Sequence, residues 1–192
     1  MRRLNLIGRN RAARVSKRLV LLLLVAALAL AGGCRRGGKM PVETIEEESQ
    51  PLASMIHTAD PRASTQLLRG FHDIEQGAWR WSMGKFSVTL KPPAGGAKNG
   101  ARIEVKLSVP DPVIQKLQAV TLSASVNGVA IGSETFSKAG DFTFSKEIAA
   151  STGAMAQDAV TVDFTLDKFL AAGTVEQREL GVVVSSIGLL SK

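Results

Sequence analysis

Hydrophobic and polar residues alternate with a period of two over most of the chain after residue 67. Successive side chains of a β-strand point to opposite faces, so this alternation predicts strands with one buried and one solvated face. The clearest segments are 85–91, 102–109, 120–127 and 160–167. Weaker alternation predicts further strands at 69–75, 78–83, 129–136, 141–148 and 179–189.

The same pattern predicts an antiparallel arrangement, because strands of buried parallel sheets are apolar on both faces. Asn127-Gly128 lies between two segments and predicts a tight hairpin with a type I′ turn. Gly132 predicts a β-bulge in the strand that follows. Short helical turns are expected at 112–117 and 149–155.

The expected architecture follows from the number of strands. About nine half-buried strands do not bury their apolar faces in a single open sheet. The sequence therefore predicts an all-β domain, an antiparallel two-sheet β-sandwich with jelly-roll-like connections. A closed barrel is the alternative.

The N-terminus departs from this pattern. Seven basic residues and no acidic residue accompany an apolar run of twelve residues at 19–30, which is too short to span a bilayer. The small residues Ala31, Gly32 and Gly33 then precede Cys34, the single cysteine. These features predict a cleaved secretion signal.

The residues before Cys34 resemble the lipobox of bacterial lipoproteins, although Ala31 stands where leucine is more common. The resemblance implies that Cys34 carries a lipid and becomes the mature N-terminus. We therefore expect an exported protein, lipid-anchored at the cell membrane or the outer membrane. The predicted organisation is a signal peptide at 1–33, a lipidated N-terminus and flexible tether at 34–66, and a β-sandwich domain at 67–192.

Removal of the signal changes the charge of the protein. The signal holds seven of the 24 basic residues and none of the 17 acidic ones, so 17 residues of each sign remain. A nucleic-acid-binding face needs an excess of basic residues, and this balance argues against one. Once Cys34 is lipidated no thiol remains for a disulfide or a metal, and we expect no cofactor.

Unusual residues concentrate at 70–82, with the sequence GFHDIEQGAWRWS. Strand geometry places Trp79 and Trp81 on one face and Arg80 on the other. Two such tryptophans either pack between sheets, which we favour, or stack against sugar rings. Arg80 is expected to pair with Glu75 across the first hairpin. The candidate ligand-binding residues are Glu75, Trp79, Arg80 and Trp81.

Four short motifs and Glu75 carry a second resemblance. The motifs are Gly70-Phe71, Trp79-Arg80-Trp81-Ser82, Arg178-Glu179-Leu180-Gly181 and Ser186-Ile187-Gly188-Leu189. Together they resemble bacterial β-sandwich domains that occur in envelope proteins and as accessory domains beside glycosyltransferases. The resemblance implies a setting related to carbohydrate and supplies no catalytic residues.

The sequence argues against an enzyme. His72 points away from the face shared by Asp73 and Glu75 on an extended strand, so the three do not converge. No nucleophile elbow, metalloprotease motif or phosphate loop is present. We expect a non-catalytic domain that binds an envelope glycan or protein. The alternatives are a structural or assembly lipoprotein without a small ligand, and a carbohydrate-active hydrolase built from distant carboxylates.

Overall fold

The computed structural model describes residues 51–192. The predicted signal peptide, Cys34 and most of the predicted tether lie outside this range. None of the described helices is long and apolar enough to cross a membrane.

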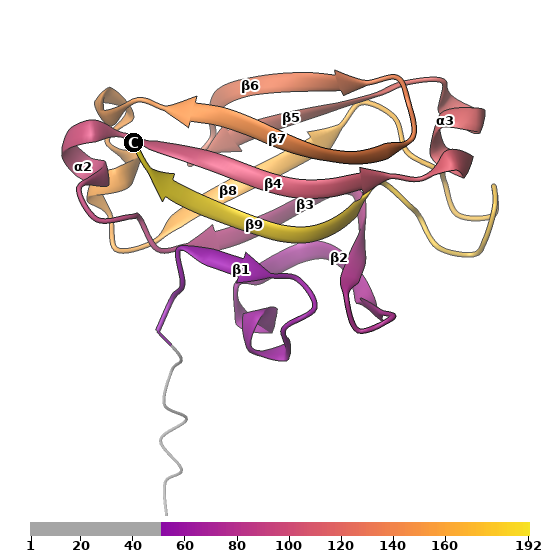
Figure 1. Cartoon of the computed structure of the whole chain (residues 1–192), viewed down its shortest axis with the longest axis horizontal. Helices are drawn as coiled ribbons and strands as arrows, with labels where there is room; N and C mark the ends of the chain where they lie inside the picture. The colour runs from indigo at the N-terminus through magenta and orange to yellow at the C-terminus, as the bar shows by residue number, and fades with distance from the viewer. Residues whose placement is uncertain (1–50) are drawn as a thin grey trace, which may run out of the picture. The chain divides into compact units, whose positions relative to one another are not determined.

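Nine strands make up most of the described chain (Figure 1). They are β1 (Met55–His57), β2 (Leu67–Glu75), β3 (Trp79–Leu90), β4 (Ala101–Val109), β5 (Val120–Val126), β6 (Val129–Phe136), β7 (Gly140–Ile148), β8 (Val160–Leu166) and β9 (Val183–Ser191). The short helices are η1 (Pro61–Thr65), α2 (Gly96–Asn99), α3 (Asp111–Leu117), η2 (Ala150–Thr152) and η3 (Ala154–Ala156).

All nine strands belong to one hydrogen-bonded antiparallel sheet in the order β6-β5-β8-β3-β9-β4-β7, with β2 added to β3 and β1 added to β9. Its two end strands approach each other in Figure 1. Side chains connect them: Lys146 on β7 contacts Glu134 on β6 at 2.9 Å, and the rings of Phe136 and Phe142 lie 4.8 Å apart. The sheet is therefore nearly closed into a barrel-like fold.

The prediction of an all-β, nine-stranded antiparallel domain is confirmed, whereas the prediction of two separate sheets needs correction. The reason is the length of β3, which was predicted as two strands on either side of Gly84. As one strand of twelve residues, it pairs with β8 over 85–90 and with β9 at Arg80 and Trp81. Hydrogen bonds thus join the two halves of the sheet, as in the barrel alternative.

The apolar faces of the strands enclose a single core. Almost every apolar position of the four clearest segments is buried, and the aromatic rings of Phe86, Phe144 and Phe164 lie among the largest fully buried side chains. The Phe86 and Phe164 rings stack with 4.8 Å between centroids. The alternation in the sequence therefore identified the core correctly.

Local turn chemistry also confirms two predictions. Asn127 and Gly128 have φ values of 47° and 83°, and Val126 pairs directly with Val129 in the expected hairpin. Pairing of Ala124 with Gly132 and of Ser125 with Ala130 shifts the register at that point, which is the predicted bulge.

Part of the segment predicted as a tether packs on the domain. Strand β1 pairs with β9, and Ile56 within it is buried. The buried Gln66 side chain accepts a hydrogen bond from the Ala53 amide at 3.0 Å and donates to the carbonyls of Ala53 and Thr89 at 3.0 and 2.8 Å. A strand of three residues is too short to show alternation, so the sequence did not indicate it.

Candidate functional site

A row of paired residues crosses the outer face of four neighbouring strands. Trp81 on β3 pairs with Val183 on β9, Val183 pairs with Ser108 on β4, and Ser108 pairs with Asp141 on β7. Directly paired residues project to the same face of a sheet, so these four side chains lie side by side. Trp79 lies two residues before Trp81 on β3 and shares its face.

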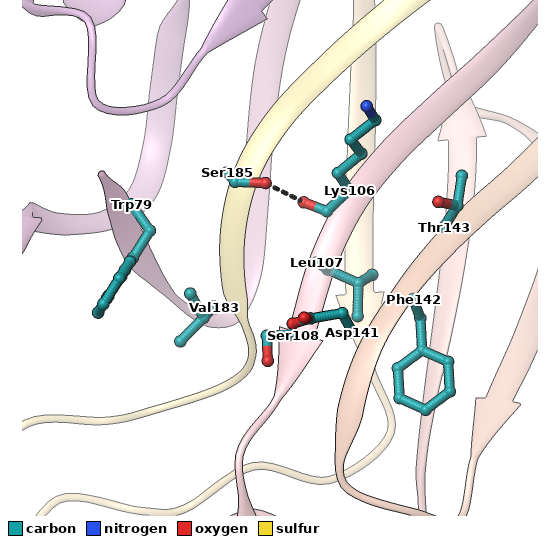
Figure 2. Close-up of a pocket in the computed structure, with 9 residues that line it drawn as sticks. All are labelled: Trp79, Lys106, Leu107, Ser108, Asp141, Phe142, Thr143, Val183 and Ser185. Carbon is teal, nitrogen blue, oxygen red and sulfur yellow. Dashed lines mark hydrogen bonds between the residues drawn. The ribbon is translucent and has the colours of Figure 1, made fainter.

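A groove opens along this row, and Figure 2 shows part of it. One part of the groove is lined by Trp79 with Lys106, Thr143 and Ser185, and the adjoining part by Trp79 with Trp81, Glu75 and Pro110. Ser108, Asp141 and Val183 line both parts. We call this groove the tryptophan cleft, with Glu75, Trp79, Trp81, Lys106, Ser108 and Asp141 as its principal residues.

The two tryptophans are half-buried, and neither is enclosed in the core. Trp81 packs against the core cluster, whereas Trp79 forms a wall of the cleft. The expectation of core packing therefore applies in part to Trp81 and not to Trp79. Both indoles contribute surface to the cleft.

Arg80 does not pair with Glu75, contrary to the sequence-based expectation. Its Nε donates to the Thr58 carbonyl at 2.7 Å, and its Nη1 donates to the His72 carbonyl at 2.8 Å. The register explains the difference, because Glu75 pairs with Trp79 while Arg80 pairs with Ile74. The Glu75 and Arg80 side chains consequently leave opposite faces of the hairpin. Arg80 ties the hairpin to the segment after β1 and lies outside the cleft lining.

Glu75 instead binds Arg178, which lies in the loop between β8 and β9. Arg178 Nη1 donates to Glu75 Oε1 at 2.8 Å, and Arg178 also forms an ion pair with Glu176. The hydrogen bonds that Arg178 donates to Glu176 and then to Glu75 raise the pKa of Arg178 above its ordinary value. The hydrogen bond from Arg178 in turn lowers the pKa of Glu176. Arg178 thus bridges the carboxylates of Glu75 and Glu176.

No pattern in the sequence marked Lys106, Ser108, Asp141 or Arg178 as site residues. The first three occupy polar positions of alternating strands, as many solvated residues do. Only the pairing of β4 with β7 and β9 brings them beside the tryptophans. Arg178 belongs to one of the four motifs that resemble bacterial β-sandwich domains. Its pairing with Glu75 depends on the path of the long loop between β8 and β9, which the sequence does not reveal.

The arrangement does not resemble an acid–base centre. His72 Nε2 lies 2.6 Å from the Glu179 carbonyl, Asp73 is exposed, and Glu75 is engaged by Arg178. Within residues 51–192, no group of three or more histidine, cysteine or acidic side chains is placed to hold a metal ion. The cleft offers aromatic surface, hydroxyl groups and single charged side chains.

Comparison with known proteins gives only distant likenesses. No family model matches the sequence, and no curated protein matches it. The fold is similar to the CBM36-1 domain of a multidomain xylanase from the hindgut metagenome of Trinervitermes trinervoides, with 8% identity and a TM-score of 0.39 over 72% of this chain and 96% of that domain. It is also similar to dimeric latent PorU from Porphyromonas gingivalis, with 12% identity and a TM-score of 0.34. That match covers 56% of this chain and spans 10% of PorU.

Proposed function

We propose that this protein is a membrane-anchored, non-catalytic glycan-binding protein and that the tryptophan cleft is its binding site. The observation that carries the proposal is the row formed by Trp81, Val183, Ser108 and Asp141, with Trp79 beside it. It places two partly exposed indoles next to a hydroxyl and a carboxylate on one face of a rigid sheet.

The chemistry of a sugar ring fits this combination. The C–H groups of a pyranose form an apolar face that packs on an indole, which offers a large and rigid surface. Its hydroxyl groups donate hydrogen bonds to a carboxylate and exchange them with a serine hydroxyl. Asp141 and Ser108 occupy the positions from which such bonds reach a ring seated on Trp79 or Trp81.

Replacement of Trp79 by alanine tests the proposed site. Trp79 is half-buried and is absent from the side chains packed on the core, so its loss is expected to leave folding largely intact. Tryptophans in binding sites commonly contribute about 2 kcal/mol or more to the free energy of binding. A change of about 1.4 kcal/mol corresponds to a factor of ten in the dissociation constant. We expect Trp79→Ala to weaken glycan binding by at least about tenfold on an array probed with the full-length protein in detergent.

Two further variants complete this test. Trp79→Phe retains an aromatic face and should recover part of the binding. Trp81→Ala should lower both the affinity and the melting temperature, because Trp81 also packs against the core. Unchanged binding by both alanine variants would show that the cleft is not the glycan site.

The proposal of a membrane anchor is based on the sequence around Cys34. We expect Cys34→Ser to abolish lipid attachment and to leave the precursor uncleaved or released from membranes. Ala31→Leu, which brings the segment closer to the lipoprotein pattern, should preserve lipidation. Mass spectrometry of the membrane-extracted N-terminus measures both results, and an unmodified Cys34 in the parent protein would contradict the anchor.

A further inference from the structure

We propose that the tryptophan cleft selects anionic saccharides, with Lys106 binding a carboxylate or sulfate group of the sugar next to the ring that stacks on Trp79. This inference rests on the proposed function and adds the chemical class of the ligand. It follows from the position and the charge environment of Lys106.

Lys106 belongs to the same sheet face as the tryptophan row. It lies two residues before Ser108 on β4, so its side chain projects to the same side, about 7 Å along the strand. Lys106 and Trp79 line the same part of the cleft, as Figure 2 shows. Trp79 lies two residues before Trp81 just as Lys106 lies two residues before Ser108, so the two residues are level with each other across β9, two strand spacings or about 10 Å apart. A ligand stacked on Trp79 therefore reaches the ammonium group through a neighbouring sugar residue that lies across β9.

The Lys106 ammonium is available to a ligand. Lys106 is exposed, and it takes part in none of the ion pairs found within residues 51–192. Its backbone carbonyl, not its side chain, accepts the hydrogen bond from the Ser185 hydroxyl at 3.2 Å. A lysine ammonium is a point charge with three donors, and it binds anionic oxygens from several directions.

The neighbours of Lys106 also favour an anionic group at this end of the cleft. Thr143 pairs directly with Lys106 on β7 and is exposed, so its hydroxyl can donate to the same anion. The Glu75 carboxylate, at the other part of the cleft, is paired with Arg178, which also binds Glu176. Asp141 lines this part of the cleft as well as the adjoining one and pairs with Ser108, so we assign its carboxylate to the uncharged hydroxyl groups of the sugar. Among the residues of the described chain that line the two parts of the cleft, Lys106 is the single basic one.

A binding experiment with matched ligands tests the inference. The probes are tetragalacturonate and its fully methyl-esterified form, together with an array of paired acidic and neutral oligosaccharides. Each is measured with the full-length protein in detergent, with Lys106→Gln, and with Lys98→Gln. Lys98 is an exposed residue of helix α2 that does not line the cleft, so its variant removes the same charge elsewhere.

We expect the acidic member of at least one pair to bind about tenfold more tightly than its neutral counterpart, since hydrogen bonds between charged groups are stronger than those between neutral groups. Lys106→Gln should remove most of this difference, and Lys98→Gln should preserve it. Added salt should weaken binding of the acidic member more than binding of the neutral one.

The other outcomes separate the inference from the proposed function. Equal binding of acidic and neutral members that is lost in Trp79→Ala would overturn the anionic preference and retain the glycan site. An acidic preference that persists in Lys106→Gln would overturn the role of Lys106. Absence of binding to every oligosaccharide, or binding that depends on neither Trp79 nor Trp81, would overturn both the inference and the proposed function.

Discussion

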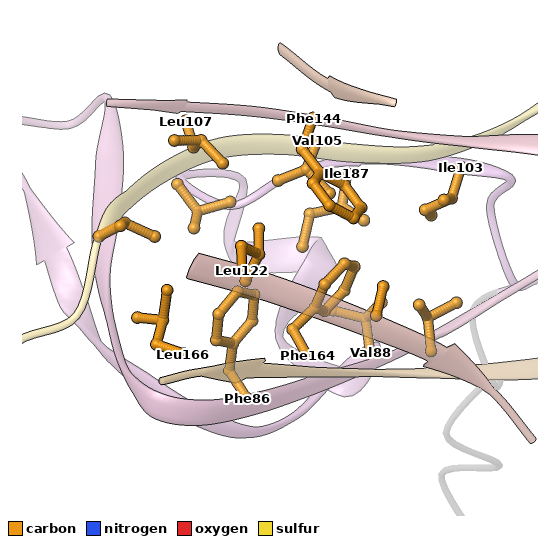
Figure 3. Packing of buried hydrophobic residues seen from close by; sticks show 14 of the residues in the cluster. Phe86, Val88, Ile103, Val105, Leu107, Leu122, Phe144, Phe164, Leu166 and Ile187 are labelled. Carbon is orange, nitrogen blue, oxygen red and sulfur yellow. The ribbon is translucent and has the colours of Figure 1, made fainter. Parts of the chain in front are cut away.

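Replacement of Phe164 by alanine is expected to lower the free energy of unfolding by about 3–5 kcal/mol, the usual cost of removing a buried phenylalanine ring. Phe164 on β8 is 1% exposed. Its ring stacks on Phe86 of β3 at 4.8 Å and meets the edge of Phe144 of β7 at 6.3 Å. As Figure 3 shows, Phe164 lies where side chains from the two sides of the barrel-like sheet meet. The variant therefore leaves a cavity that neither side can fill alone.

Chemical denaturation of the parent and variant proteins measures this effect. Phe169→Ala is the matched control, because Phe169 follows β8 and is 37% exposed. The control should cost less, about 1–2 kcal/mol, since the Phe169 ring packs over Gly84 at the surface and is partly in contact with water. Similar losses for the two variants would contradict the placement of Phe164 at the centre of the core.

Replacement of Gly70 by alanine is expected to lower the free energy of unfolding by more than about 4 kcal/mol, at least as much as Phe164→Ala. A loss of this size is exceptional for the addition of one methyl group. Gly70 lies in β2 where the register with β3 shifts, and its φ is +76°. A Cβ atom there would lie 2.0 Å from the Lys85 carbonyl oxygen and 2.7 Å from the Phe86 Cα. Both atoms belong to the backbone of β3, so relief requires the two strands to separate.

A second glycine isolates this steric effect. Gly128 in the hairpin turn has a φ of +83°, but nothing lies within 4 Å of its added Cβ. Gly128→Ala should therefore lower the free energy of unfolding by only about 1–2 kcal/mol, the cost of holding an alanine at a positive φ. Thermal or chemical unfolding of the two variants gives the comparison. If Gly70→Ala cost no more than Gly128→Ala, the close approach of β2 and β3 would be disproved.

Local chemistry was predictable from sequence because each signal lies within a few consecutive residues. The hairpin at Asn127 depends on two positive φ values, and the bulge at Gly132 depends on one glycine. The core face of each long strand follows from alternation alone. Strand β1 was not predictable, because three residues are too few to show an alternation of period two.

The pair predicted between Glu75 and Arg80 shows where local reasoning fails. The two residues are close in sequence and opposite in charge, but the hairpin register sends their side chains to opposite faces. Glu75 binds Arg178, 103 residues away, and Arg80 binds backbone carbonyls. Opposite charges near each other in sequence pair only if the backbone directs them to the same side.

The sequence by itself determined an all-β antiparallel domain, the positions of most strands and the apolar residues of the core, because burial of one strand face depends on an alternation contained in each segment. The closure of the sheet and the composition of the tryptophan cleft were decided by the tertiary structure. Long-range register sets Ser108 and Asp141 beside Trp81, and Lys106 near Trp79. No single strand carries that information, since the polar face of each one is equally compatible with bulk solvent.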